Sequence, residues 1–387
     1  MSGSMIDRVR ERLAVETAPL RPPVVAAAIR AEAGGVLGDT EVLNSLRMLE
    51  TELTGAGILE PLLRTEGVTD VLVSAPDEVW VDDGNGLCRS EIRFPDEASV
   101  RRLAQRLANA VGRRLDDAQP WVDGQLAGVG GGQFTVRLHA VLPPIAVAGT
   151  CVSLRVLRPA SQDLAGLTTA GAISPDAAAL LADIISSRLA FLVSGGTGAG
   201  KTTLLAAALG SVAGHERIVC VEDAPELAPR HPHIVRLVAR SANVEGAGEV
   251  TLRHLVRQAL RMRPDRIVVG EVRGAEVVDL LAALNTGHDG GAGTVHANSP
   301  AEVPARLEAL AALDGLSPAA LHSQLGAAVQ VVLHVSRGPR GRRLSEIAVL
   351  DRDYTGRVRV LPVWHVDRGW QSGAQLLREL LDDRCAR

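Results

Sequence analysis

Gly195-Gly196-Thr197-Gly198-Ala199-Gly200-Lys201-Thr202 is the stretch that decides the fold. It matches the phosphate-binding pattern G-x-x-x-x-G-K-[ST] at every fixed position. The preceding residues 189–194 are mostly apolar and predict a short buried strand, and residues 203–209 predict a helix that begins at the loop. A strand, a glycine-rich loop and a helix in this order are the context that the motif requires, which disfavours a glycine-rich turn without a ligand.

The residue types in this stretch suit a phosphate cradle. Glycines let backbone N–H groups converge on phosphate oxygens, and the first turn of the following helix points free N–H groups at the same anion. Lys201 is the only lysine in the chain; its narrow ammonium group suits the β- and γ-phosphates, and the Thr202 hydroxyl suits Mg²⁺. We expect ATP and Mg²⁺ to be bound by the loop and the start of its helix, that is by Gly195, Gly196, Thr197, Gly198, Ala199, Gly200, Lys201, Thr202 and Thr203.

Composition places the chain among globular proteins. Its 387 residues are enough for two or three domains, and contents of 46% hydrophobic and 22% charged residues are ordinary globular values. The net charge is −4, and aromatic residues make up 2% of the chain. Both values argue against nucleic acid as a partner, because binding it needs a positive surface and, for single strands, aromatic stacking.

The cysteines and the N-terminal residues bear on location. Four cysteines lie far apart with no C-x-x-C pair, so we expect no zinc site and reduced thiols, as in a cytoplasmic protein. The N-terminal residues carry charges where a signal peptide has an apolar run, and no apolar stretch of about 18 residues occurs. We therefore expect a cytoplasmic protein, and any membrane association must be peripheral or through a partner.

The hydrophobic pattern divides the chain into four parts. Residues 1–56 repeat apolar positions at helical spacing, and residues 57–158 show short strands around a helix, which predicts a small α/β domain. Residues 159–174 contain proline, serine and charged residues and are interpreted as a linker. In residues 175–387 helices and strands alternate after an N-cap at Ser174, and this alternation predicts a parallel sheet with helices on both faces.

Acidic residues follow two predicted strands of the second domain. Glu222 and Glu226 come directly after one apolar strand, and Glu271 ends the next. Because the carboxyl ends of parallel strands face the ligand crevice, we expect these candidate catalytic acids beside the phosphate loop; an exposed acidic loop is the alternative for the first two. Glu271 would hold Mg²⁺ through water or activate the attacking water, although Gly270-Glu271 stands where many such enzymes have aspartate.

Histidines and arginines complete the candidate catalytic residues. His288 and His296 lie eight positions apart across glycines, in what we interpret as one loop that responds to the γ-phosphate. Their spacing matches no structural zinc pattern. Arg137 and Arg155 lie on predicted strands of the first domain. They are candidates to reach the nucleotide from outside the ATPase core, as arginine fingers do.

Three segments of the second domain together resemble a known family. Arg217–Leu227 resembles the Asp box, Arg266–Arg273 an atypical Walker B element and Thr286–Asn298 the His box of the ATPases that power type II secretion, type IV pili and type IV secretion. Within that family, Glu245–Thr251 and Asn285–Gly290 look like the tight-adherence (Tad/CpaF-like) pilus assembly ATPases. The resemblance is strong over the middle of the chain and weak at both ends.

The resemblance implies a homohexameric, Mg²⁺-dependent ATPase. It implies a PAS-like N-terminal α/β domain joined by a flexible linker to a RecA-like P-loop ATPase domain, with nucleotide bound between the two and touched by Arg137 and Arg155. Glu226 then matches the catalytic glutamate of the Asp box, Glu271 the Walker B glutamate, and the two histidines the His box. Inner-membrane platform proteins of a pilus or secretion system are the implied partners. The tetracysteine zinc module of some type II secretion members is missing from the sequence.

Three other functions remain as alternatives. Within the same class, the chain could drive a conjugation-like type IV secretion channel. It could also be an assembly scaffold that binds ATP without cycling, which the presence of the loop, the acids and the paired histidines disfavours. A DNA-translocating motor is the third alternative, and the low aromatic content and acidic balance count against it.

Overall fold

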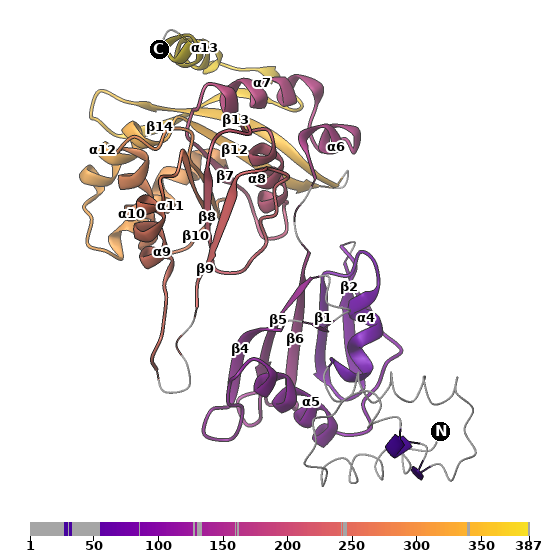
Figure 1. Ribbon diagram of the computed structural model, residues 1–387. Helices are drawn as coiled ribbons and strands as arrows, with labels where there is room; N and C mark the ends of the chain where they lie inside the picture. Colours follow the sequence, from indigo (N-terminus) through magenta and orange to yellow (C-terminus); the bar gives the residue numbers. More distant parts are fainter. Residues whose placement is uncertain are drawn as a thin grey trace. The chain divides into compact units, whose positions relative to one another are not determined.

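The structure is a computed structural model that describes residues 27–29, 31–32, 55–84, 86–126, 128–129, 134–158, 160, 162–240, 242, 246–338 and 341–385. It forms two compact units, Met1–Arg158 and Pro159–Arg387 (Figure 1). The predicted helical region of residues 1–56 lies almost entirely outside the described residues.

The first unit contains a six-stranded antiparallel sheet with the strand order β3-β2-β1-β6-β5-β4. Helix α5 begins at the N-cap Asp96, whose carboxylate accepts a hydrogen bond from the N–H of Ser99, and it buries Val100, Leu103 and Leu107 in the core of this unit. The described elements of the unit are, in chain order, η1 (Gly57–Leu59), α4 (Glu60–Arg64), β1 (Asp70–Ala75), β2 (Glu78–Asp82), β3 (Leu87–Arg89), α5 (Glu97–Ala110), β4 (Trp121–Leu126), β5 (Thr135–Val141) and β6 (Cys151–Leu157).

The second unit contains a nine-stranded sheet with helices on both faces (Figure 1). Its strand order is β15-β14-β13-β12-β7-β11-β10-β8-β9. The elements are, in chain order, α6 (Leu164–Thr169), α7 (Pro175–Ser186), β7 (Phe191–Ser194), α8 (Lys201–Gly210), β8 (Ile218–Glu222), β9 (Ile234–Val238), α9 (Leu252–Ala259), η3 (Leu260–Met262), β10 (Arg266–Val272), α10 (Glu276–Leu284), β11 (Ala292–Val295), η4 (Pro300–Glu302), α11 (Val303–Ala312), α12 (Pro318–Ala328), β12 (Val331–Gly338), β13 (Gly341–Arg352), β14 (Val358–His365), β15 (Gly369–Trp370) and α13 (Ala374–Cys385).

Strand direction confirms the predicted fold class. The strands from β12 to β9 in the sheet order pair in parallel, and β13, β14 and β15 extend the sheet with antiparallel pairs. The chain is therefore an α/β protein in which a parallel-rich sheet follows a smaller α/β unit. The antiparallel extension does not follow from the helix and strand alternation that predicted the sheet.

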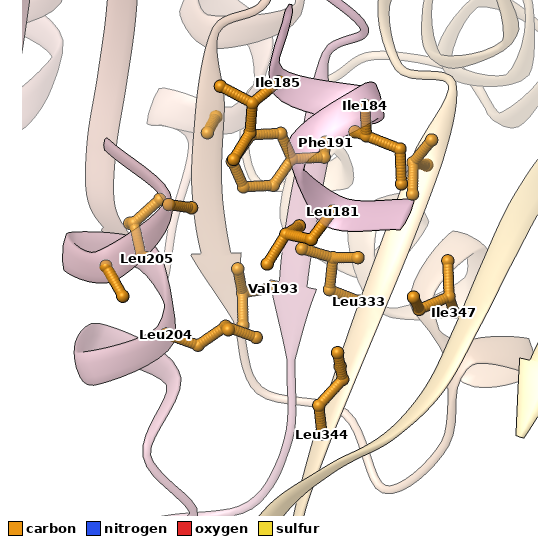
Figure 2. Packing of buried hydrophobic residues seen from close by; sticks show 14 of the residues in the cluster. Leu181, Ile184, Ile185, Phe191, Val193, Leu204, Leu205, Leu333, Leu344 and Ile347 are labelled. Atoms are coloured by element: carbon orange, nitrogen blue, oxygen red, sulfur yellow. The ribbon is translucent and has the colours of Figure 1, made fainter. Parts of the chain in front are cut away.

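Strand β7 shows why the sheet has two cores. Successive side chains of a strand point to opposite faces, so Phe191 and Val193 pack in one core with α7 and α8, while Leu192 belongs to the other. Figure 2 shows the first core, where Leu181 of α7 faces the strand. All four residues of β7 are buried. The strand that carries the phosphate loop is thus held from both sides.

Residues 159–174, interpreted above as a linker, belong to the second unit. They include α6, whose N-cap Asp163 accepts a hydrogen bond from the N–H of Gly166 and whose Leu167 is buried in the first core. Ala160 also donates its backbone N–H to the carbonyl oxygen of Glu226 at 3.0 Å. Helix α7 begins as predicted, with the Ser174 hydroxyl accepting a hydrogen bond from the first turn. Ordered contacts of the second unit therefore start before residue 175.

The side chain of Arg266 is only 1% exposed, at the start of β10. Its Nε and Nη2 donate to Glu216 at 2.9 and 3.0 Å, Nη2 also donates to the carbonyl oxygen of Ile185 at 2.8 Å, and Nη1 donates to that of Gly290 at 3.3 Å. One guanidinium group thus ties the end of α7, the segment before β8 and the segment before β11 together at the amino-terminal edge of the parallel strands.

We predict that Arg266→Ala lowers the free energy of unfolding by about 3 kcal/mol, because it breaks a buried ion pair and removes one hydrogen-bond donor each from the carbonyl groups of Ile185 and Gly290. Glu216 keeps Arg188 as a partner at 3.0 Å, which places the loss at the lower end of the range for buried pairs. Urea unfolding measures it. Arg359→Ala, which removes the more exposed pair with Asp351, is the control and should cost less than about 1 kcal/mol. Equal small losses in both variants would contradict the prediction.

Candidate active site

Parallel pairing brings several strand ends to one edge of the sheet. Ser194, the last residue of β7, is in register with Val295 of β11 and with His334 of β12. Strand β10 pairs in parallel with both β11 and β8. The phosphate loop after β7, the acids that end β8 and β10, and the histidine after β11 therefore meet at this edge, as expected for the carboxyl ends of parallel strands.

The phosphate loop depends on glycine at three positions. Gly198 and Gly200 have φ angles of 69° and 101°, in the left-handed region that favours glycine. A Cβ atom at Gly195 would lie 2.4 Å from the carbonyl oxygen of Val335 on β12. Helix α8 begins directly after Gly200 without a side-chain cap. The N–H groups of its first turn therefore remain available to an anion at the loop.

Lys201 is buried, and the backbone of its own loop holds its ammonium group. Nζ donates to the carbonyl oxygens of Gly195 at 3.1 Å and Gly196 at 2.9 Å, and it lies 3.4 Å from both ring nitrogens of His296. Burial lowers the pKa of Lys201, an effect that the charge of Glu271 opposes. A phosphate group at the loop would supply further negative charge to this ammonium group.

Glu271 lies between Arg273 and His296. Arg273 Nη2 donates to Oε2 of Glu271 at 2.5 Å, and His296 Nε2 lies 2.5 Å from Oε1. The second contact lacks the alignment of a hydrogen bond, so Oε1 is buried without an aligned donor among the described residues.

The charges of this cluster decide which of its groups are ionised. Burial alone would raise the pKa of Glu271, but the hydrogen bond from Arg273 and the positive charges of Arg273 and Lys201 outweigh burial and lower it. Burial, and then the charge of Lys201, lower the pKa of His296. At neutral pH, Glu271 is therefore ionised and His296 is mostly neutral.

Glu226 and Glu222 have different positions. Glu226 faces the phosphate loop, where the Thr202 hydroxyl donates to its Oε2 at 3.3 Å. Glu222 is 2% exposed, and its Oε1 accepts the backbone N–H groups of Glu226 at 3.0 Å and Leu227 at 2.8 Å. Glu222 thus fixes the turn that presents Glu226. These bonds aim its Oε1 at the backbone of that turn and give it a positioning role.

The glycine at position 270 has a steric reason. A Cβ atom there would lie 2.9 Å from Cγ of Glu222 on the neighbouring strand β8. The carbonyl oxygen of Gly270 also accepts a hydrogen bond from the Thr294 hydroxyl at 2.7 Å. Because the side chain of Glu222 occupies this space, the strand continues through glycine and the acid follows at position 271.

The expectation that His288 and His296 share one loop is wrong. Strand β11 lies between them, so His296 follows the strand at the edge of the phosphate loop and His288 precedes it at the opposite edge. Nδ1 of His288 lies 3.1 Å from the carbonyl oxygen of Ala283 near the end of α10. The next residue, Asp289, pairs with Arg384 of α13 at 2.6 Å. The structure therefore places His288 at a helix end, away from the phosphate loop.

Arg137 and Arg155 belong to the first unit and lie side by side. They are register partners on β5 and β6, so their side chains project from the same face of the sheet. Arg137 pairs with Asp123 at 2.7 Å, and Arg155 pairs with Asp70 at 2.8 Å. This face of the sheet thus presents two adjacent cations, each with a carboxylate beside it.

Sequence analysis does not find two further residues of the edge. Arg273 holds Glu271, and its position two residues after that acid is the only local signal for it. His334 on β12 is buried, its Nδ1 lies 2.9 Å from the Ser194 hydroxyl, and burial lowers its pKa. Ser194 and His334 are 140 positions apart in the sequence, so only the folded sheet brings them together.

The residues at this edge fit a nucleotide with Mg²⁺. Thr202 supplies a hydroxyl and Glu226 and Glu271 supply carboxylates, the oxygen donors that Mg²⁺ prefers in proteins. The loop glycines, the start of α8 and Lys201 suit the phosphate groups.

This fold and this edge define a P-loop protein with a parallel-rich α/β sheet. Residues 52–364 match the sequence model of the family described as "Type II/IV secretion system protein". The chain belongs to this family, the superfamily of type II and type IV secretion ATPases, as the resemblance predicted. Within the described residues, none of the helices combines the length and the apolar composition that a membrane span requires.

Three known proteins illustrate the likeness. The chain is 75% identical over 352 residues to the Mycobacterium tuberculosis (strain ATCC 25618 / H37Rv) protein Rv3659c, whose name provisionally assigns it to conjugal transfer, with 91% of this chain and 100% of the relative covered. It is 34% identical over 266 residues to the Sinorhizobium fredii (strain NBRC 101917 / NGR234) protein TrbB, whose name also provisionally assigns it to conjugal transfer, with 68% of this chain and 77% of TrbB covered. The solved structure of the pilus retraction motor PilT with bound ADP has a TM-score of 0.51 at 20% identity, covering 79% of this chain and 81% of PilT, and shows a shared fold.

We predict that Glu222→Gln gains stability relative to the wild type as the pH rises. Burial raises the pKa of Glu222 from 4.5 to about 7. Between these values the unfolded chain has released the proton while the folded chain still holds it, so the wild type loses stability with rising pH. Glutamine does not titrate, so the free energy of unfolding of the variant, relative to the wild type, should increase by about 2–3 kcal/mol from about pH 4.5 to about pH 8.

Urea unfolding at a series of pH values measures this difference. Glu379→Gln is the matched control, because Glu379 is exposed on α13 and its replacement should leave the pH dependence close to that of the wild type. A difference between Glu222→Gln and the wild type that stays constant with pH would show that Glu222 titrates at the same pH in both states.

Proposed function

We propose that this chain is an Mg²⁺-dependent ATP hydrolase that works as a homohexamer and powers pilus assembly or protein secretion of the tight-adherence type at the inner face of the cell membrane. The observation that carries the proposal is the cluster of Lys201, Glu271, Arg273 and His296 beside a complete phosphate loop. A scaffold that only binds nucleotide needs the loop but not an ionised, partly buried acid next to it. Membership of the secretion ATPase family supports the same conclusion.

The residues at the edge divide the work of hydrolysis. Lys201 and the loop N–H groups bind the phosphates, and Thr202 holds Mg²⁺, which neutralises charge on the phosphate oxygens. Glu271, kept ionised by its neighbours, orients the attacking water and accepts its proton. Glu226, beside Thr202, is the second acid at the metal side of the loop.

His296 and the two arginines of the first unit complete the proposal. His296 lies close to both Lys201 and Glu271, so it is placed to respond when the γ-phosphate leaves. Arg137 and Arg155 contact the nucleotide phosphates and couple the two units to hydrolysis. Changes between the units then act on inner-membrane platform proteins of the pilus or secretion system.

A conjugation-type secretion motor is the second candidate function. The relatives Rv3659c and TrbB support it, since the names of both refer to conjugal transfer. The two functions differ in what a cell loses without the protein. Deleting the gene and measuring surface pili and the frequency of DNA transfer separates them: loss of pili alone supports pilus assembly, and loss of transfer alone supports conjugation.

We predict that the wild type releases phosphate from Mg-ATP and that two single variants do not. Lys201→Ala removes the cation that binds the phosphates, and its turnover should fall on the order of 100-fold. Glu271→Gln keeps the shape of the acid but not its charge, and its turnover should fall about 10²–10⁴-fold. Steady-state phosphate release measures the turnover of the wild type and of both variants. Light scattering on the same samples gives the mass in solution and so tests whether the protein is a hexamer.

Glu379→Gln on α13 serves as the control for loss of a carboxylate, and it should retain wild-type turnover. Full turnover in Glu271→Gln would remove that acid from the mechanism. A hexamer that binds Mg-ATP but shows no turnover, with or without membranes that carry its platform partners, would instead support a scaffold.

A further inference from the structure

The hairpin of β12 and β13 lies against both ends of the phosphate loop. At the start of the loop, Gly195 is so close to β12 that a Cβ atom would lie 2.4 Å from the carbonyl oxygen of Val335. At its end, a Cβ atom at Gly200 would lie 3.6 Å from Cδ and 3.8 Å from Cβ of Arg342 on β13. The aliphatic stem of Arg342 therefore packs beside the last glycine before Lys201.

Arg342 differs from the adjacent Arg343 in its ion pairs. Arg343, the next residue, pairs with Asp367 at 3.0 Å. Arg342 is exposed, and within the described part of the chain no carboxylate lies within ion-pair distance of its guanidinium group. The charge of Arg342 is thus available to a ligand at the loop.

The opposite strand adds a second cation at the same place. Arg337 of β12 is the register partner of Arg342, so the two side chains project from one face of the sheet. The face of the hairpin that carries the stem of Arg342 therefore also carries the side chain of Arg337.

The order of the strands in the sheet decides which end of a bound nucleotide would lie near Arg342. Strand β7, which carries the loop, has β11, β10 and β8 on one side and β12 and β13 on the other. The acids Glu226 and Glu271, with His296, come from the first side, where the terminal phosphate and its attacking water must be. Arg342 comes from the other side and faces the opposite end of the ligand.

We infer that Arg342 binds the α-phosphate end of the nucleotide and supplies affinity for a nucleoside di- or triphosphate without taking part in hydrolysis. This inference rests on the proposed function. Arginine suits the role because its planar fork can bind phosphate oxygens with two parallel hydrogen bonds. The residue lies outside the phosphate-loop motif, and its position beside Gly200 arises only when the hairpin folds against β7.

Binding measurements with two ligands test the inference. Arg342→Ala should weaken the affinity for Mg-ADP about tenfold or more, the effect of losing a hydrogen bond to a charged group. Its affinity for inorganic pyrophosphate, which occupies the loop without an α-phosphate or nucleoside, should stay within about twofold of the wild type. In turnover, KM for ATP should rise by about the same factor as the ADP dissociation constant, with little change in kcat.

Arg343→Ala is the matched control, since it removes the adjacent arginine and only its pair with Asp367. It should bind Mg-ADP like the wild type. Thermal unfolding without ligand should be unchanged in Arg342→Ala, because Arg342 is exposed and its removal breaks no ion pair with another described residue.

Each other outcome has a distinct meaning. Wild-type affinity for Mg-ADP in Arg342→Ala overturns the inference and leaves the proposed function in place. Equal weakening of pyrophosphate and ADP overturns the assignment to the α-phosphate end. A wild-type protein that binds neither ligand overturns the proposed function and this inference with it.

Discussion

The buried ammonium group of Lys201 is the constraint on which the rest of the site depends. A buried ammonium group needs hydrogen-bond acceptors or negative charges around it, because otherwise burial favours its neutral, deprotonated form. Here the partners come from the loop carbonyls, from Glu271 near the end of β10 and from His296 after β11. No single segment could supply them, so the parallel sheet is a condition for the site. Arg273 and the buried Glu222 then hold the two acids in place, Arg273 through Glu271 and Glu222 through the backbone of Glu226.

How far the sequence predicts this protein depends on whether a signal is local. The phosphate loop, the acids at 226 and 271 and the alternating strands are local patterns, and all of them lie where parallel pairing predicts. His288 and His296 also form a local pattern, but the short strand between them contains glycine and threonine and lacks the long apolar run that marks a buried strand. The sequence therefore predicts one loop, whereas in the structure the chain runs along strand β11 from one edge of the sheet to the opposite edge.

Residues that act through distant contacts carried no signal. His334 contacts Ser194 from a strand far along the chain, and Arg342 packs beside Gly200 from the strand after it. The glycine at 270 is a related case. The sequence shows that Gly270-Glu271 departs from the usual acidic pattern but gives no reason for it, and the structure supplies a steric one, because the side chain of Glu222 fills the space that a Cβ atom at Gly270 would need.

Arg137 and Arg155 of the first unit form weak ion pairs that another anion can replace. Arg137 and Arg155 pair with Asp123 and Asp70, and three of these four side chains are at least 40% exposed. Exposed ion pairs contribute about 0–1 kcal/mol, whereas a hydrogen bond to a charged group contributes about 1.5–3 kcal/mol. A phosphate can therefore take these arginines from their carboxylates at little cost. Under the proposed function, the carboxylates would still be beside the arginines when a phosphate leaves, so the exchange would be reversible. Two adjacent cations with nearby alternative partners thus suit a contact that must form and break in every cycle, as the proposed motor requires.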